Sequence, residues 1–387
     1  MKPAILGGTP IFSPALPFAK PYLPAYGQVE EHFREIMASG MLTKGKYLEE
    51  YEQDLATYLQ VPHAIAVSSC TMGLILLAKA LGLKGEVIVP SFSFFATFHS
   101  LVWNGIKPVF VDCEPDTFTI SLKAAQNAVT PQTSGILATY LFGNPPDIEG
   151  LTELAKKNHL VLMFDAAHGF GALYHGHKPG SFGEGEVFSS SATKLLVTGE
   201  GGVVTCRDEK TARELRILRE YGNAGDYDCA VAGLNARMTE FQAVLGIEGL
   251  KTLDQQSEMR NQLAERYIAG LSRIPGIDFQ KICKNCRSSY KDFAILIDRK
   301  KFGLSRDLLQ KVLYPEGISA KAYFAPPGHL QKVYRRTNLE LEQTERISNN
   351  VLCLPFFTGM EASDLDKVVE AVERIYHNRE EISRHAD

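Results

Sequence analysis

One acid, one lysine and a run of hydroxyl side chains occupy a central stretch of the chain, residues 161–202. Asp165 follows four apolar residues, 161–164, with the composition of a buried strand. Lys194 ends the sequence Ser-Ser-Ser-Ala-Thr-Lys, which begins at Ser189, and a Gly-Glu-Gly-Gly turn comes soon after it. Because open α/β sheets gather functional groups at the carboxyl ends of their strands, we expect these side chains to meet at one sheet edge.

These residue types suit pyridoxal phosphate. The cofactor needs a lysine amine for a Schiff base, a carboxylate beside its ring nitrogen, and hydrogen-bond donors for its phosphate. The carboxylate keeps the ring protonated, and a protonated ring draws electrons from a substrate carbanion. A lysine is usually a solvated surface residue, so the prediction depends on the serine run before Lys194 and the glycine-rich turn after it.

The motifs D-A-A-H-x-F-G, S-x-x-A-T-K and G-E-G-G in this stretch resemble those of the DegT/StrS-type sugar aminotransferases, which are fold-type I pyridoxal-phosphate enzymes. The resemblance extends over nearly the whole chain. It implies that Lys194 forms the Schiff base and that Asp165 pairs with the ring nitrogen. It also implies that His168 lies beside the ring near its phenolic oxygen, and that Ser189 binds the phosphate.

Three more cofactor contacts follow from the same resemblance. The sequence Ser-Ser-Cys-Thr at 68–71 lies at a predicted strand-to-helix junction, where hydroxyl groups either cap the helix or join its free N–H groups in binding an anion. The family places the phosphate there, which implies Cys70 and Thr71, although Cys70 stands where glycine or alanine is usual. Phe94 is in register with the aromatic residue that the family stacks on the ring; a core role for this phenylalanine cluster is the alternative.

The sequence G-x-N-x-R-M around Asn235 matches a family motif whose asparagine reaches the phosphate of the neighbouring subunit. This implies a homodimer with shared active sites. The segment 321–329 matches the family's substrate mouth and suggests Tyr323 and His329 as substrate contacts. Lys321 replaces the usual arginine, and a lysine binds an anion as a point charge rather than with two parallel hydrogen bonds.

The family transfers an amino group from an amino acid, usually glutamate, to a keto-sugar. The sugar is usually a nucleotide-diphosphate 4-keto-6-deoxyhexose, and the product is an aminosugar for polysaccharide, O-antigen or antibiotic assembly. A sugar dehydratase of the same fold would carry histidine in place of Lys194, and a purely regulatory or binding protein would have no need of that lysine. A nicotinamide dehydrogenase would require G-x-G-x-x-G after the first strand, and the chain lacks it there.

Strands and helices are predicted to alternate around these residues. This pattern predicts an α/β protein whose mostly parallel central sheet is covered by helices, as in fold-type I. Strands are expected at His63–Val67, Glu86–Pro90, 108–112, 136–140, 161–164, 187–188 and 203–205, and helices at 29–39, 47–59, 70–83, 121–129, Ile148–Asn158 and 209–220.

We expect an irregular N-terminal arm at 1–26, a large cofactor-binding domain at 27–250, and a connector helix with a small α+β domain at 251–387. The connector is predicted as one long amphipathic helix that ends near Leu271. In the small domain, strands at Phe293–Ile297 and 318–322 should flank a helix at 305–314, and helices should follow at 341–349 and 362–384.

The 387 residues carry a formal net charge of −4 and offer no basic patch for nucleic acid. No apolar stretch reaches membrane-spanning length and no signal peptide is apparent, so we expect no membrane association and a cytoplasmic protein. Seven scattered cysteines indicate a reducing compartment. The pair Cys283 and Cys286 offers only two ligands, so we expect no metal.

Overall fold

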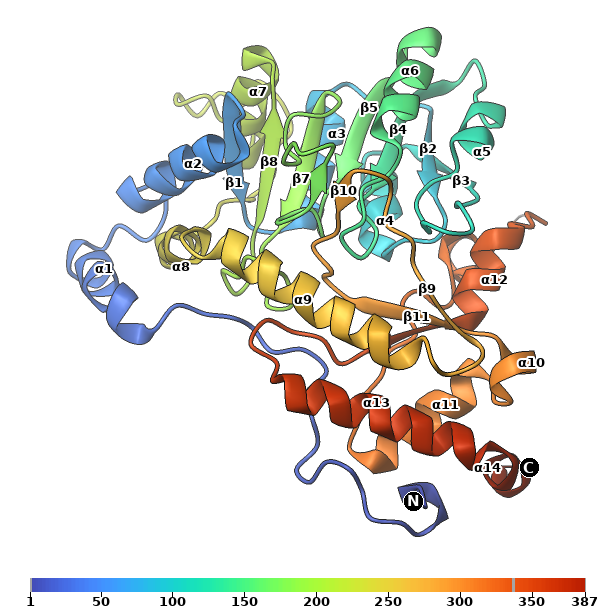
Figure 1. Cartoon of the computed structure of the whole chain (residues 1–387). Coiled ribbons are helices and arrows are strands. Elements are labelled where there is room, and N and C mark those ends of the chain that lie inside the picture. Colours follow the sequence, from blue (N-terminus) through green and yellow to red (C-terminus); the bar gives the residue numbers. More distant parts are fainter. Residues whose placement is uncertain (1, 336–337, 387) are drawn as a thin grey trace.

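Seven strands form the central sheet of the computed structural model, which describes residues 2–335 and 338–386 (Figure 1). The spatial order is β1-β8-β7-β5-β4-β2-β3. Strands β3, β2, β4, β5 and β7 run parallel to one another, and β8 is antiparallel to both of its neighbours. The predicted mostly parallel α/β sheet is therefore confirmed. The strands are β1 (His63–Val67), β2 (Glu86–Pro90), β3 (Lys107–Val111), β4 (Thr133–Thr139), β5 (Val161–Asp165), β7 (Gly185–Ser189) and β8 (Gly202–Cys206).

Both faces of this sheet are covered because each strand is apolar on both sides. Successive side chains of a strand point to opposite faces. In β1, Ile65 and Val67 pack in the same core as α3, α4 and α7, whereas Ala64 and Ala66 pack in the core that includes α2, α6 and α8. The covering helices are α2 (Lys46–Leu59), α3 (Cys70–Ala80), α4 (Phe95–Trp103), α5 (Leu122–Asn127), α6 (Ile148–Asn158), α7 (Glu209–Arg219) and α8 (Glu240–Leu250).

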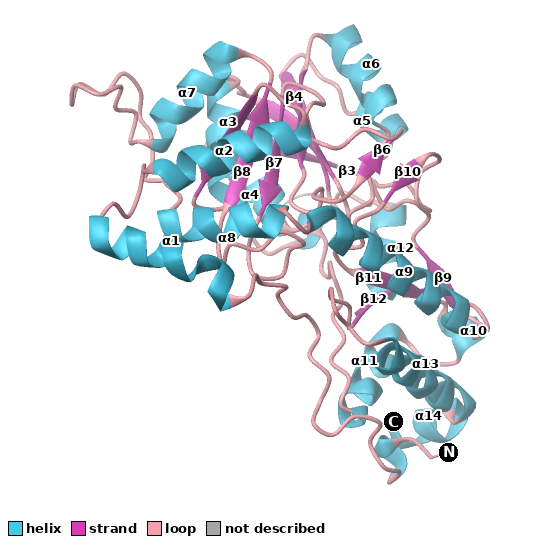
Figure 2. Ribbon diagram, turned by 60° about the vertical axis from the view of Figure 1, so that its left-hand side comes forward, coloured by secondary structure: helices cyan, strands magenta, loops and turns pink. Residues whose placement is uncertain are grey.

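A second, smaller layer lies below the large sheet (Figures 1 and 2). Its three-stranded antiparallel sheet has the order β12-β11-β9, and a two-stranded ladder joins β10 to β6 of the large part. The elements are β6 (Leu173–Tyr174), β9 (Ile277–Phe279), β10 (Cys286–Arg287), β11 (Phe293–Ile297), β12 (Val351–Leu354), α9 (Leu253–Leu271), α10 (Arg299–Phe302), α11 (Arg306–Leu313), α12 (Glu342–Asn350), α13 (Ala362–His377) and α14 (Arg379–Ala386).

The N-terminal arm crosses to this smaller layer before α1 (Tyr26–Ser39) begins. Phe12 and Leu16 are buried in its core, and their backbone N–H groups donate to the carbonyls of Glu316 and Gly317, at 3.0 and 2.9 Å. The arm contains the 3-10 helix η1 (Ala4–Leu6) and is packed against the smaller layer. Its contacts place the first residues of the chain beside the last helices (Figure 1).

Two predictions about the C-terminal half are wrong. Residues 318–322 form no strand, because their backbone pairs only at isolated bridges, from Ile318 to Leu16 of the arm and from Lys321 to Cys353. The expected single connector helix is two helices, with α8 ending at Leu250 and α9 starting at Leu253. The two have different environments: α8 packs on α1 and α2, whereas α9 packs on α13.

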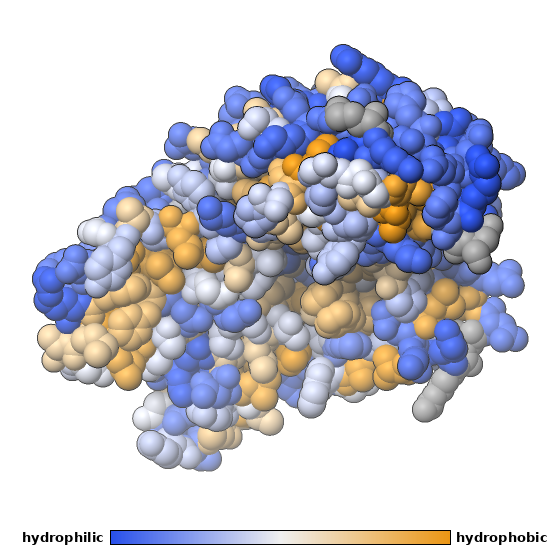
Figure 3. All heavy atoms as spheres, turned by 90° about the horizontal axis from the view of Figure 1, so that it is seen from below, coloured by the Kyte–Doolittle hydropathy of each residue, from blue (hydrophilic) through white to orange (hydrophobic). Residues whose placement is uncertain are grey.

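Apolar side chains are exposed around the C-terminal end of α1 and the loop after it. Met37, Met41 and Leu42 have exposed fractions of 71%, 53% and 51%. In Figure 3, apolar side chains gather at the left end of the face, the side on which Figure 1 places α1. In the described part of the chain, every helix is too short or too polar to cross a membrane.

Candidate active site

A cavity of about 380 Å³ opens at the carboxyl ends of the parallel strands, where the sequence predicted the functional groups to meet. Its wall is built from both sheet layers, and it includes most of the predicted site residues. Those that line it are Cys70, Thr71, Phe94, Asp165, His168, Ser189, Lys194 and Tyr323.

Asp165 is the last residue of β5, and its carboxylate is fixed inside the cavity. Oδ2 accepts a hydrogen bond from the Thr97 hydroxyl at 2.7 Å, and Oδ1 accepts one from the backbone N–H of Ala167 at 3.1 Å. Burial raises the pKa of this carboxyl, and the two hydrogen bonds oppose the rise. A carboxylate held in this way suits a cationic ring nitrogen, whose charge would offset the cost of burial.

Lys194 lies in a turn whose backbone N–H donates to the carbonyl of Ser191 at 2.9 Å. Burial and, as a smaller effect, the positive charge of Lys291 lower the pKa of its amine from 10.5 to about 8. The glycine-rich stretch behind it has a packing role. A Cβ atom on Gly202 would come within 2.6 Å of the backbone nitrogen of Cys70, so only glycine lets β8 approach the start of α3 this closely.

The start of α3 is arranged as an anion site. Ser69 caps the helix, since its hydroxyl accepts from the N–H of Met72 at 3.2 Å. This leaves Cys70 and Thr71 on the cavity wall beside Ser189 at the end of β7. Free N–H groups and the helix dipole favour a phosphate at such an end. Burial raises the pKa of the Cys70 thiol well above its ordinary value, so the thiol is neutral at physiological pH.

His168 lines the cavity as a neutral ring, because burial and the nearby lysine charges hold its pKa well below the ordinary value. Its backbone carbonyl accepts a hydrogen bond from the Ser289 hydroxyl at 2.7 Å. On the same wall, the Thr139 hydroxyl is buried and has no hydrogen-bond partner within the described part of the chain. A lysine amine, a fixed carboxylate, a helix N-terminus and an unpartnered hydroxyl in one cavity fit pyridoxal phosphate.

Two predicted site residues lie outside the cavity lining. Asn235 is exposed, and its backbone pairs with Glu220. His329 is buried between Ser91, whose Oγ lies 2.7 Å from Nδ1, and Glu345, whose Oε1 lies 3.2 Å from Nε2. Both ring nitrogens of His329 are therefore occupied, which argues against the predicted substrate contact, and we do not propose it.

Several wall residues were missed by the sequence analysis. Lys291 and Asp292 enter the cavity from the segment that precedes β11, and Phe324 and Glu200 also line it. The Nζ of Lys291 lies 2.8 Å from Oδ1 of Asp292. The sequence signal that could have indicated these two residues is a pair of adjacent charges immediately before a wholly apolar strand.

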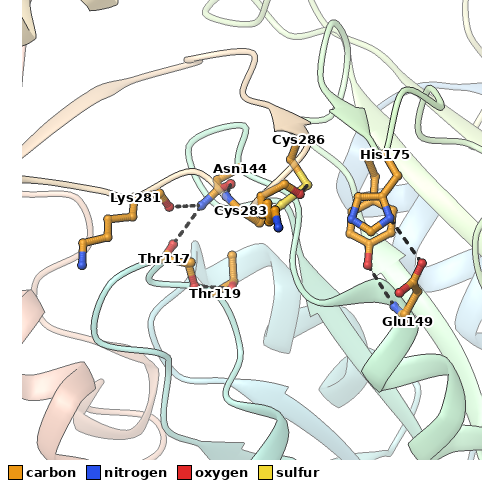
Figure 4. The surroundings of a disulfide bond; sticks show 10 residues. Thr117, Thr119, Asn144, Glu149, His175, Lys281, Cys283 and Cys286 are labelled. Atoms are coloured by element: carbon orange, nitrogen blue, oxygen red, sulfur yellow. Dashed lines mark hydrogen bonds and ion pairs between the residues drawn. A yellow bond between two sulfur atoms is a disulfide. The ribbon is translucent and has the colours of Figure 1, made fainter.

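The segment leading to this pair is anchored on the large layer by a disulfide-bearing loop. Cys283 and Cys286 form a disulfide, which the sequence analysis did not predict (Figure 4). The side-chain amide of Asn144 donates to the carbonyls of Lys281, at 2.9 Å, and Thr117, at 3.3 Å.

In the described residues, no group of three or more His, Cys, Asp or Glu side chains could hold a metal ion.

The model of the DegT/DnrJ/EryC1/StrS aminotransferase family matches residues 27–373. The chain belongs to this family. It is 31% identical to the spore coat polysaccharide biosynthesis protein SpsC of Bacillus subtilis, over 92% of this chain and 96% of that protein. It is also 31% identical to the Escherichia coli dTDP-4-amino-4,6-dideoxy-D-glucose transaminase, over 92% of this chain and 97% of that enzyme.

A solved structure supports the same conclusion. The crystal structure of DesI in the presence of its TDP-sugar product has a TM-score of 0.93 and 34% identity, and the match covers 99% of both chains. The protein Spr1654 of Streptococcus pneumoniae, solved in PLP and PMP forms, is 24% identical with TM-scores of 0.87 and 0.88, which shows a shared fold. The chain is thus a sugar aminotransferase, and the family and the predicted fold are confirmed.

Proposed function

We propose that this chain transfers an amino group from an amino acid, glutamate, to a nucleotide-diphosphate 4-keto-6-deoxyhexose, with pyridoxal phosphate as its cofactor. The observation that carries the proposal is the meeting of the Lys194 amine and the fixed Asp165 carboxylate in one cavity. The names of two relatives support the sugar class, since one is a dTDP-4-amino-4,6-dideoxy-D-glucose transaminase and DesI was solved with a TDP-sugar product.

When bound, pyridoxal phosphate supplies a carbonyl for the amino group and an electron-poor ring that stabilises a carbanion. Asp165 holds a proton on the ring nitrogen. Lys194 binds the cofactor and, with a pKa of about 8, can carry a proton to and from the substrate carbon near neutral pH. Ser189 and the N–H groups at the start of α3 bind the phosphate, with Cys70 and Thr71 contributing their backbone.

Two side chains set the cofactor's orientation in this proposal. Phe94 precedes α4 on the cavity wall, 44% exposed, and its ring would stack on the cofactor's pyridine ring. The neutral ring of His168 would share a hydrogen bond with the phenolic oxygen without adding charge. Tyr323 lines the same cavity and would contact the sugar.

We also propose that the enzyme acts as a homodimer with shared active sites. Asn235 is exposed on its own subunit and lies outside that subunit's cavity lining. The exposed apolar side chains Met37, Met41 and Leu42 lie on α1 and the following loop. The carbonyl of Leu42 accepts from the N–H of Glu240, which joins this loop to the segment that carries Asn235. A partner that covers this surface would place its own Asn235 against the phosphate site.

The experiment that tests the reaction supplies purified enzyme with glutamate and a panel of nucleotide-linked keto-sugars, and reads the products by mass and NMR. We expect one aminosugar to form with release of 2-oxoglutarate, and the carbon that carries nitrogen follows from the NMR spectrum. Lys194→Ala should lose this activity and retain the folded spectrum. Unchanged turnover in that variant, or no aminosugar from any keto-sugar, would refute the proposal.

A further inference from the structure

Lys291 and Asp292 form a buried ion pair on the cavity wall that the catalytic roles above do not use. Their side chains are 8% and 5% exposed, and the two atoms that pair are 2.8 Å apart. Burying two charges costs more free energy than burying apolar residues of the same volume, and the mutual attraction often does not recover that cost. A buried ion pair on the cavity wall therefore indicates that a ligand contacts these two charged groups.

The backbone around the pair is held by hydrogen bonds to Phe142 and Arg260. The N–H of Lys291 donates to the carbonyl of Phe142 at 2.9 Å, and its own carbonyl accepts from Arg260 at 3.1 Å. One residue earlier, the carbonyl of Tyr290 accepts from the same guanidinium at 3.1 Å. The two charged groups therefore enter the cavity from a fixed backbone, which is what specific recognition requires.

The pair has hydrogen-bond donors and an acceptor that are not used within the described residues. Oδ2 of Asp292 is buried and has no hydrogen-bond partner among the residues that the structure describes. An ammonium carries three donors, and among the described residues the Nζ of Lys291 donates one hydrogen bond, to Oδ1 of Asp292. An acceptor and free donors thus lie side by side, next to the Tyr323 ring, whose centroid is 5.8 Å from Nζ.

The net charge of the pair is zero. This distinguishes between the two substrates of a sugar aminotransferase, the amino acid and the keto-sugar. The carboxylate of an amino acid would face the unpartnered oxygen of Asp292 and be repelled by it. A sugar hydroxyl can donate to that oxygen while it or its neighbour accepts from Lys291. The half-buried ring of Tyr323 gives the apolar face of a sugar a surface to pack on.

We propose that Lys291 and Asp292 form a hydroxyl-recognition subsite for the keto-sugar, which sets the enzyme's choice of sugar and leaves its choice of amino donor unaffected. This inference rests on the proposed function and goes beyond it, since it assigns the discrimination between sugars to two residues. It predicts that a sugar lacking the recognised hydroxyl leaves a buried charge unpaired, and such a loss is severe.

The two half-reactions can be measured separately, because glutamate and the keto-sugar change the absorbance of the bound cofactor in opposite directions. For Asp292→Asn, we expect the sugar half-reaction to need about 10- to 100-fold more keto-sugar for half-maximal rate. The glutamate half-reaction, compared with each enzyme at its own pH optimum because Asp292 also influences the pKa of Lys194, should stay within about twofold of the wild type, since the amino acid does not contact the pair. Calorimetric titration of the cofactor-free protein with the aminosugar product should show the same fold-loss of affinity, independently of turnover.

A matched control is Glu316→Gln, because that carboxylate is also buried in an ion pair, 3.1 Å from Arg374, but lies outside the cavity lining. It should leave both half-reactions unchanged. If Asp292→Asn does not fold, wild-type enzyme is titrated with single-deoxy analogues of the aminosugar, of which one should bind at least about 100-fold more weakly.

The inference would be overturned by equal loss in both half-reactions, by loss confined to glutamate, or by wild-type affinity for sugar in Asp292→Asn. Equal binding of all single-deoxy analogues would overturn it as well. Failure of the proposed function looks different, because wild-type enzyme would then respond to glutamate and to no nucleotide-linked keto-sugar.

Discussion

The amine of Lys194 should titrate more than two pH units below an ordinary lysine in the cofactor-free protein. Its pKa falls from 10.5 to about 8, first because of burial and then because of the positive charge of Lys291. At pH 7 an amine with a pKa of about 8 is roughly 10% neutral, against roughly 0.03% at 10.5, so the fraction of reactive neutral amine should be about 300-fold higher. Lys291→Met removes the nearby cation and should raise the pKa.

The assay is acylation of the cofactor-free protein with a limiting reagent at a series of pH values, followed by digestion and mass spectrometry. Modification of Lys194 should have its midpoint near pH 8, with surface lysines of the same digest as the internal reference. The folded state also binds fewer protons than the unfolded state between pH 8 and 10.5. Relative to Lys194→Met, the wild type should therefore gain up to about 3 kcal/mol of stability across that window. A midpoint at or above pH 10, or no shift in Lys291→Met, would refute the reasoning.

Three further predictions concern the cofactor, the dimer and the disulfide. Asp165→Asn should lower kcat about 100- to 1,000-fold, because the ring nitrogen loses its anionic partner. The control is Glu186→Gln, which changes a buried acid on the neighbouring strand β7, outside the cavity lining, and should leave kcat unchanged. Equal losses in the two variants would contradict the role assigned to Asp165. Lys194→Ala and Asn235→Ala subunits, each inactive alone, should regain about a quarter of wild-type activity when they are mixed. Half of the dimers then contain one subunit of each kind, and each such dimer has one intact site. No recovery after verified subunit exchange would exclude shared sites. Cys283→Ser should lower the free energy of unfolding, measured in urea, by at most about 2 kcal/mol, because the disulfide closes a loop with only two residues inside it. A larger loss would mean that the disulfide also stabilises the packing around it.

The large layer could be read from the sequence because its signals are local. The strand before Asp165 and the serine run before Lys194 each lie within a few residues of the chemistry they position. Parallel strands then bring those local motifs to one edge without further information. The same holds for the helix start at Cys70, where the capping serine and the free N–H groups belong to one short sequence.

The remainder depends on contacts between distant parts of the chain. Lys291 and Asp292 reach the cavity only because their segment crosses back from the smaller layer and hydrogen-bonds to Phe142. His329 is buried by Ser91, 238 residues away in sequence, and no local pattern indicates that pairing. The missing strand at 318–322 has the same origin, because the N-terminal arm occupies one end of that segment.

The central claim is that Lys194, and not its cavity neighbour Lys291, carries pyridoxal phosphate. The direct measurement is borohydride reduction of the cofactor-loaded enzyme, followed by peptide mass spectrometry. The account predicts a pyridoxyl mass on the peptide that contains Lys194, and loss of that label in Lys194→Ala. Label on Lys291, or on no lysine at all in enzyme that has bound the cofactor, would contradict it.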